Sequence, residues 1–204
     1  MEGIPTQSTR AKHVGGALAD AAVCTGALKV GRAGFSDVPP FLVDIAQGAL
    51  QCKFNTVYLE FLGQVALARL LLGAVLRALL RGVTLDHPGW YLLRVRDGRR
   101  TLGCALVSRC SDQDGALIDI RLVAVRPDAR RRGAGSTLVR HVLQCARGDT
   151  RVRCTCTVYA HEMVALVQKL DFRRTQVGRE LASGVRRPDE FTYRSRAGLK
   201  RSGG

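Results

Sequence analysis

Residues 116–147 contain the pattern that most constrains how this chain folds: an apolar strand-like run, a basic turn with two glycines and an apolar helix-like run. The run ALIDIRLVAV, residues 116–125, is rich in β-branched residues and alternates as a strand does. Pro127 and Asp128 follow it, and both residue types are common at the start of a helix. Beyond the turn, apolar residues recur at helical spacing: Leu138, Val139, Val142, Leu143 and Ala146. The sequence therefore predicts a strand, a short turn and the N-terminus of a helix.

The turn itself, RRRGAG at residues 130–135, predicts an anion-binding site. The first N–H groups of a helix have no partner within the helix, and the aligned peptide dipoles place partial positive charge there. Gly133 and Gly135 have no Cβ, so the main chain can approach a ligand closely. Phosphate or pyrophosphate suits such a site. Neither the GxxxxGK[ST] loop nor the third glycine of the dinucleotide fingerprint is present. A solvated basic loop that caps an ordinary helix is the alternative.

Length and composition fit one well-cored globular domain. The chain has 204 residues, of which 46% are hydrophobic and 24% are charged. Its formal net charge is +15, but the 27 arginines and 5 lysines are spread along the chain and only 5% of the residues are aromatic. This pattern does not favour a nucleic-acid partner, whereas the charge suits an anionic cofactor.

The cysteines predict an intracellular protein without a metal site. Seven cysteines form an odd set without the spacing of a disulfide framework, and no His-x-His or second cysteine pair accompanies Cys154 and Cys156. These two are two residues apart in a strand-like run, so we expect their side chains on the same side. The first residues make a poor signal peptide. Reduced thiols and a cytoplasmic location are the expectation.

The order of elements predicts one mixed domain over residues 27–196. A flexible lead at 1–26 and a mobile basic tail at 197–204 are expected to flank it. The predicted elements are a strand at 27–33, a helix at 36–50, a long apolar segment at 58–83, a hairpin at 89–109, the strand at 116–125, a helix at 135–147, a strand at 151–159, a helix at 161–170 and a strand at 190–195. This order is typical of an α/β or α+β fold in three layers.

Three segments of the chain resemble the GCN5-related N-acetyltransferase (GNAT) superfamily. The family's loop [Q/R]-x-x-G-x-[G/A] is matched by residues 130–135, and its strand with a valine pair before x-Pro is matched by Val123, Val125 and Pro127. The stretch VALVQKLDF, residues 164–172, resembles the family's A-x-x-L-Y-x-K-x-G-F segment. The resemblance implies a mixed central sheet of about seven strands flanked by helices.

The resemblance also implies an acetyl-CoA site on the turn. The N–H groups of residues 131–136 would hold the pyrophosphate, and the strand backbone before the turn would pair with the pantetheine arm. Arg130 and Arg132 either add charge near the phosphates or are mostly solvated. The implied cofactor-binding residues are Val123, Ala124, Val125, Arg130, Arg131, Arg132, Gly133, Ala134, Gly135 and Ser136.

The implied activity is direct transfer of an acetyl group from acetyl-CoA to an amine, which needs a base and an acid. Asp119 falls where some family members carry a glutamate base, and a surface strand carboxylate paired with Arg121 is the alternative. Val167 occupies the position of the family's usual acid, a tyrosine. Tyr159 is therefore predicted as the substitute acid, and a packed aromatic residue is the alternative.

Two further departures from the family pattern leave a second function open. Asp171 stands where the family has glycine, and Ala160 stands where it has asparagine. A catalytically weakened CoA-binding or regulatory module is therefore the alternative to an active enzyme. The sequence identifies neither the amine acceptor nor the oligomeric state.

A narrower resemblance concerns the camello-like subgroup of the superfamily. LVRHVLQCARG and VALVQKLDFRRTQ read closely like that subgroup, and so does an apolar segment between the first helix and the second strand. In that subgroup the segment attaches the enzyme to the endoplasmic-reticulum membrane, and acceptors include cysteine conjugates, aspartate and lysines. Residues 61–80 contain Arg69 and Arg77, so no charge-free window of about 20 residues exists there. The sequence favours a buried helix, and membrane association is the alternative.

Overall fold

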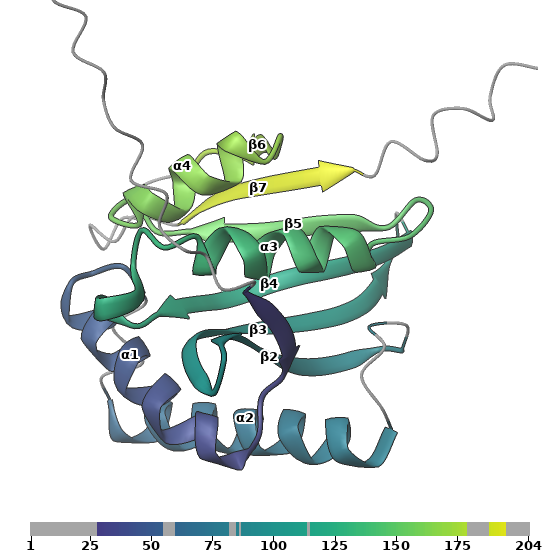
Figure 1. Cartoon of the computed structure of the whole chain (residues 1–204). Helices are drawn as coiled ribbons and strands as arrows, with labels where there is room; N and C mark the ends of the chain where they lie inside the picture. Colours follow the sequence, from purple (N-terminus) through teal and green to yellow (C-terminus); the bar gives the residue numbers. More distant parts are fainter. Residues whose placement is uncertain are drawn as a thin grey trace, which may run out of the picture.

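Seven strands form one mixed sheet in the order β1-β2-β3-β4-β5-β7-β6 (Figure 1). β4 and β5 run parallel, and the other neighbouring strands are antiparallel. This sheet, with helices on its faces, confirms the predicted fold class. The computed structural model describes residues 28–54, 60–81, 85, 87–113, 115–178 and 188–194, without the side chains of 78–81 and 112. The predicted lead at 1–26 and tail at 197–204 lie outside the described residues.

The elements follow one another much as the sequence predicts. In chain order they are β1 Lys29–Arg32, η1 Phe35–Asp37, α1 Val38–Leu50, α2 Phe61–Arg81, β2 Gly89–Asp97, β3 Arg100–Asp112, β4 Gly115–Val125, η3 Pro127–Ala129, α3 Ala134–Cys145, β5 Arg151–Cys156, α4 His161–Lys169, β6 Arg173–Gln176 and β7 Asp189–Arg194.

Two apolar layers hold the helices against the sheet. On one face, Leu138 and Val142 of α3 and Val167 of α4 pack with strand residues in a single core cluster. On the other face, residues of α1 and α2 form a second cluster with β2, β3 and β4. In Figure 1, α1 and α2 lie together below the sheet. Burial of these apolar side chains on both faces is the main source of stability.

A β-bulge in β4 shifts the alternation of its side chains between the two faces of the sheet by one residue. Leu106 of β3 pairs with Leu122, but the next residue, Val107, pairs with Ile120, so Arg121 is the extra residue. In a regular strand Ile120 and Leu122 would share a face. Here Ile120 belongs to the cluster under α3, and Leu122 belongs to the cluster under α1 and α2.

β4 and β5 separate just before this bulge. Their parallel pairing runs from Leu117 with Arg151 to Ile120 with Cys154, and no pairing follows among the described residues. Beyond Ile120 the backbone of β4 pairs only with β3, so its other edge is left open. A sheet that splits in this way exposes unpaired main-chain groups inside the molecule.

The long apolar segment forms α2, which packs with one face only. Leu67, Leu71 and Ala74 are buried in the second cluster, as expected of a buried helix. The opposite face remains exposed and apolar, with Phe61 80% exposed and Leu76 52% exposed. None of the described helices is long and apolar enough to span a membrane.

Two strand assignments from the sequence need correction. β5 ends at Cys156 rather than at 159, because the N–H of Ala160 bonds the carbonyl of Thr157 and turns the chain. Tyr159 therefore lies in a turn and not at a strand end. β6, Arg173–Gln176, is a strand that the sequence does not predict, because all four of its residues are exposed and polar.

Candidate functional site

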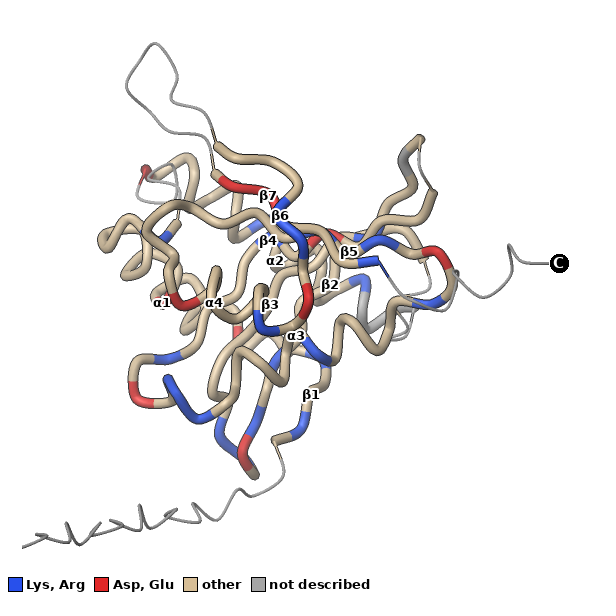
Figure 2. Tube along the Cα trace, turned by 90° about the horizontal axis from the view of Figure 1, so that it is seen from above, with Lys and Arg blue, Asp and Glu red and all other residues tan. Residues whose placement is uncertain are grey.

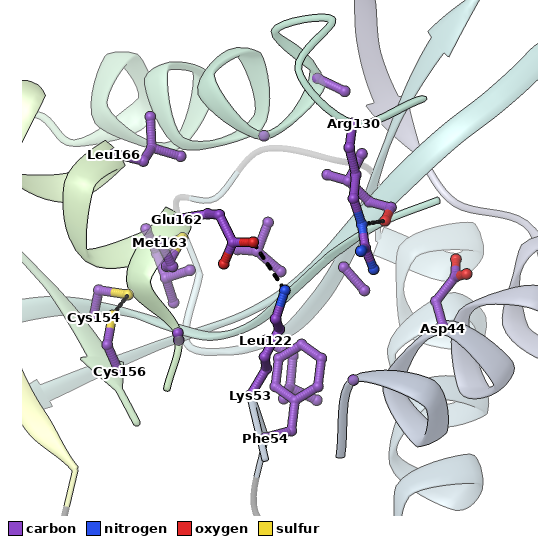
Figure 3. Close-up of a pocket in the computed structure, with 18 of the residues that line it drawn as sticks. Asp44, Lys53, Phe54, Leu122, Arg130, Cys154, Cys156, Glu162, Met163 and Leu166 are labelled. Atoms are coloured by element: carbon purple, nitrogen blue, oxygen red, sulfur yellow. Dashed lines mark hydrogen bonds and ion pairs between the residues drawn. The ribbon is translucent and has the colours of Figure 1, made fainter. Parts of the chain in front are cut away.

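A cavity of about 600 Å³ opens where β4 and β5 separate (Figure 3). Its lining comes from α1 and the segment after it, from β4, from the turn into α3, from β5 and from α4. Nine of the ten predicted cofactor-binding residues lie in this lining: Val123, Ala124, Val125, Arg130, Arg131, Gly133, Ala134, Gly135 and Ser136.

The turn into α3 has the geometry of an anion-binding loop. Gly133 is the N-cap of α3 with φ 81°, and Arg131 also has a left-handed φ of 60°. The first bond of the helix runs from the N–H of Thr137 to the carbonyl of Gly133, at 2.9 Å. The N–H groups of residues 134–136 precede it and have no acceptor within the helix. They line the cavity together with the positive end of the helix dipole.

Gly135 lets a ligand approach the start of α3. A Cβ at this position would lie 3.7 Å from Leu166 Cδ2 and 3.7 Å from Val125 Cγ2, which is ordinary contact. A longer side chain would extend into the cavity that these residues line. The start of α3 can therefore bind a diphosphate only while residue 135 has no bulky side chain.

The open edge of β4 offers main-chain hydrogen bonds to a ligand. On one side Val123, Ala124 and Val125 pair with Ala105, Cys104 and Gly103 of β3. The other side of this segment faces the cavity. An extended chain with amide groups, such as pantetheine, can bind this edge as an added strand does.

The three arginines of the turn point in different directions. Arg130 and Arg131 line the cavity, whereas Arg132 binds Asp97, the last residue of β2, with 2.9 Å between nitrogen and oxygen. Arg132 is not among the lining residues. Figure 2 shows that the Lys and Arg positions of the described residues are spread over many elements.

Asp119 is fully buried and lies outside the cavity lining. Its Oδ2 is 2.8 Å from Arg121 Nε and 2.9 Å from a terminal nitrogen of Arg153. The hydrogen bond to Asp119 raises the pKa of Arg153. Oδ1 of Asp119 has no hydrogen-bond partner among the described residues. The pairing with Arg121 that the sequence left open as an alternative is therefore present, but the carboxylate is buried and not on the surface.

The cavity lining contains neither Tyr159, the predicted acid, nor Val167, which stands at the position of the family's usual acid. Tyr159 is 57% exposed and is absent from the lining, and Val167 is fully buried in the core. The structure thus does not bring Tyr159 and Asp119 together at the cavity.

Three charged residues that no sequence pattern predicted line the cavity. Lys53, between α1 and α2, binds Glu162 of α4 with 2.9 Å between Nζ and Oε1. The hydrogen bond from Lys53 lowers the pKa of Glu162. Asp44 of α1 is the third, and burial raises its pKa while Arg126 and Arg130 oppose the rise. No motif marks these residues, because they come together only in the fold.

Cys154 and Cys156 lie side by side in the cavity lining, as their spacing predicts. Their sulfur atoms are 3.8 Å apart, and both side chains are buried. The hydrogen bond between them raises the pKa of Cys154, with burial adding to the rise, and lowers that of Cys156. Both are free thiols.

Comparison with known proteins assigns this architecture. The family described as "Acetyltransferase (GNAT) family" matches residues 66–172, which include β4, the turn, α3, β5 and α4. This is more than half of the chain. The chain belongs to the GNAT acetyltransferase family. No curated protein sequence shows a significant match to it.

Solved structures share the fold at low sequence identity. Arabidopsis thaliana NAA60 in complex with a bisubstrate analogue has TM-score 0.56 and 13% identity, over 82% of this chain and 99% of that one. The Escherichia coli ribosomal-protein-S18-alanine N-acetyltransferase has TM-score 0.51 and 14% identity, over 82% and 93%. The PaiA N-acetyltransferase of Thermoplasma acidophilum, in complex with coenzyme A, has TM-score 0.56 and 9% identity, over 82% and 99%.

Proposed function

We propose that this GNAT protein is an N-acetyltransferase that transfers the acetyl group of acetyl-CoA directly to an amine. One observation carries the proposal: the N–H groups at the start of α3 and the open edge of β4 line the same cavity. The first can bind a pyrophosphate and the second an amide-bearing arm, and coenzyme A contains both. Similarity to N-acetyltransferases, one of them bound to coenzyme A, supports this reading.

The residues of the chain would divide the work as follows. The N–H groups of residues 134–136 bind the pyrophosphate, and the Arg130 and Arg131 side chains add positive charge beside it. A backbone N–H on the open edge of β4 stabilises the oxyanion that forms at the thioester carbonyl. Bound acetyl-CoA supplies the acetyl group and a thiol leaving group with a pKa of about 8.5, by analogy with cysteine.

Proton transfer in this reaction needs a base for the ammonium proton and an acid for the leaving thiolate. Asp119 as base stays a prediction, and only its unpartnered Oδ1 is free to accept a proton. Tyr159 as acid also stays a prediction, and it acts only if the exposed turn that carries it closes over the ligand. If Tyr159 is the acid, Tyr159→Phe lowers kcat modestly, since a thiolate leaves tolerably without help.

Release of CoA thiol, followed over time with a panel of amines, tests the activity. We expect thiol release that depends on the amine and follows saturation kinetics in acetyl-CoA. Calorimetric binding of acetyl-CoA without thiol release from any amine would instead support the regulatory module. Absence of acetyl-CoA binding would refute both functions.

Membrane association through residues 61–80, and with it the camello-like assignment, stays a prediction. Its support is the exposed apolar face of α2, where Leu62 is 78% exposed and Leu72 43% exposed. A membrane-bound protein would sediment with microsomes, resist carbonate extraction and indicate an endoplasmic-reticulum location. Full recovery in the soluble fraction without detergent would support a cytoplasmic location and refute the anchor.

A further inference from the structure

Lys53 places a primary amine inside the candidate acetyl-CoA cavity. Its side chain is 26% exposed, lines the cavity and binds Glu162, whose own side chain is 73% exposed. In Figure 3, Lys53 projects toward Glu162 and lies between Arg130 on one side and Cys154 and Cys156 on the other. The amine thus shares its cavity with the basic side chain of the turn and with the two cysteines.

The backbone of Lys53 is fixed across the cavity from two directions. Its N–H bonds the carbonyl of Gly48 at 2.9 Å, which ties it to the end of α1. Thr157 Oγ1, just after β5, lies 3.0 Å from the carbonyl of Lys53 and 3.1 Å from that of Cys52. One contact is with the end of α1, and the other is with a residue 104 positions later in the chain. Together they fix the backbone of Lys53, unlike that of a loosely attached surface lysine.

We propose that Lys53 Nζ is an internal acceptor, acetylated by the acetyl-CoA that its own chain binds. The inference rests on the proposed function, because it needs acetyl-CoA in the cavity. Glu162 acts as the positioning residue, since its carboxylate holds the ammonium group among the lining residues. The amine and the proposed acetyl-CoA site thus share one cavity, which an intramolecular reaction requires.

The step balances as an amide-forming transfer. The Lys53 ammonium first loses one proton, and the neutral Nζ attacks the thioester carbonyl. The C–S bond breaks as the N–C bond forms, and the second nitrogen proton leaves. CoA departs as a thiolate and takes up one of the two protons, and the other passes to water. The products are N-acetyl-Lys53 and CoA thiol.

Acetylation would remove the ion pair that crosses the cavity. The amide of acetyl-lysine carries no charge and cannot form the Lys53–Glu162 ion pair. Glu162 is then free to bind the ammonium group of an external acceptor. Self-acetylation would thus change the cavity from one that holds its own amine to one that receives another.

Peptide mapping by mass spectrometry, after the full chain is incubated with acetyl-CoA, tests the proposal. The chain has only five lysines, and Lys29 and Lys169 are exposed, so they report background chemical acetylation on the same molecules. We expect Lys53 to be acetylated at least about tenfold faster than these two, because it lies in the cavity proposed to bind acetyl-CoA. The half-time should not change on dilution of the protein.

Two variants and one footprint separate this reaction from adventitious labelling. Lys53→Arg keeps a positive charge opposite Glu162 but should lose the label. Gly135→Val, with folding checked by circular dichroism, should lower labelling of Lys53 and not of Lys29. In a separate arm without acetyl-CoA, saturating CoA should protect Lys53 from acetic anhydride while Lys29 and Lys169 react as before.

Acetylation of Lys53 no faster than of Lys29 and Lys169 would overturn the inference, as would absence of protection by CoA that calorimetry shows to be bound. The proposed function survives that result if external amines still release CoA thiol. If acetyl-CoA neither binds nor reacts with any amine, the proposed function and this inference both fail.

Discussion

Asp119 Oδ2 lies 2.9 Å from a guanidinium nitrogen of Arg153, which joins β4 to β5 immediately before the two strands separate. Arg121, the extra residue of the bulge, binds the same oxygen from the other side at 2.8 Å and stacks its guanidinium over Trp90, 5.7 Å from the ring centre. A buried carboxylate thus holds together the residues at which the cavity begins. Asp119 therefore stabilises the fold at this point, whether or not it also accepts a proton.

Asp119→Asn should destabilise the protein. Removing one partner of a buried ion pair costs up to about 3–5 kcal/mol, and the partial exposure of Arg121 and Arg153 places the expected cost near about 2 kcal/mol. The melting temperature should fall by about 4–8 °C. If Asp119 is also the base, kcat of the folded variant should fall about a hundredfold or more and the pH optimum should rise.

Asp37→Asn is the matched control. Asp37 is also a buried carboxylate, bound to Arg94 at 2.7 Å, but it lies outside the cavity lining. The melting temperature of Asp37→Asn should fall, and its pH–rate profile should stay unchanged. If Asp119→Asn behaves in the same way, Asp119 is structural and the base lies elsewhere.

Gly133→Val should abolish acetyl-CoA binding, while Arg132→Ala should leave the Kd within about twofold. Valine at φ 81° is strained, so the loop that presents the N–H groups must change shape. The guanidinium of Arg132 binds Asp97 and does not line the cavity, so its removal takes no charge from the lining. Loss of this exposed ion pair should also cost little stability. Isothermal titration calorimetry measures both Kd values. Equal losses in the two variants would assign the affinity to side-chain charge.

Asp44→Asn should tighten acetyl-CoA binding at pH 7. Burial raises the pKa of Asp44, and its ionised carboxylate faces the same cavity as Arg130, where a pyrophosphate would be repelled. Because the folded pKa is raised, the cost of ionisation is absent below the unfolded pKa and grows as pH rises through the folded one. The variant should therefore also melt slightly higher at pH 7 and lose this advantage in acid. Calorimetry and thermal melts across pH 4–7 check both effects, and a gain that is independent of pH would contradict them.

Gly48→Ala should displace Phe54 and raise KM for the amine acceptor. A Cβ at residue 48 would lie 2.5 Å from two ring carbons of Phe54, and both residues line the cavity beside Lys53. Gly73→Ala is the matched control, because nothing lies within 4 Å of its Cβ position on α2. That control should gain about 0.5–1 kcal/mol of stability from helix propensity and leave KM unchanged. Steady-state kinetics on the pair would contradict the steric argument if KM moved equally in both.

The fold and the turn could be predicted because their signals are local. Residues 116–139 carry strand alternation, helix-start residues and two glycines in one continuous stretch, and each signal acts through neighbours in sequence. Cys154 and Cys156 were placed on one side for the same reason. β6 gave no such signal, because a strand with four exposed polar residues has no apolar face to alternate.

Features that depend on register or on distant contacts could not be predicted. The bulge at Arg121 is set by how β4 pairs with β3, which no local pattern records. The Lys53–Glu162 pair joins residues 109 apart in the chain. Burial of Asp119 between two arginines likewise depends on β5 lying beside β4, so its surroundings became visible only in the folded chain.

Because one extra residue divides β4 into two segments with opposite facing, the cavity depends on the number of residues in that strand as well as on their identity. Deletion of Arg121 would make the pairing with β3 regular, with Ile120 still facing α3 and Leu122 still facing α1 and α2, because the register on each side of the bulge is unchanged. The deletion would instead remove the bend that a bulge gives its strand, at the point where β4 separates from β5 and the cavity begins. Almost any single substitution at these positions leaves that geometry standing, whereas a change of three nucleotides in length would remove it.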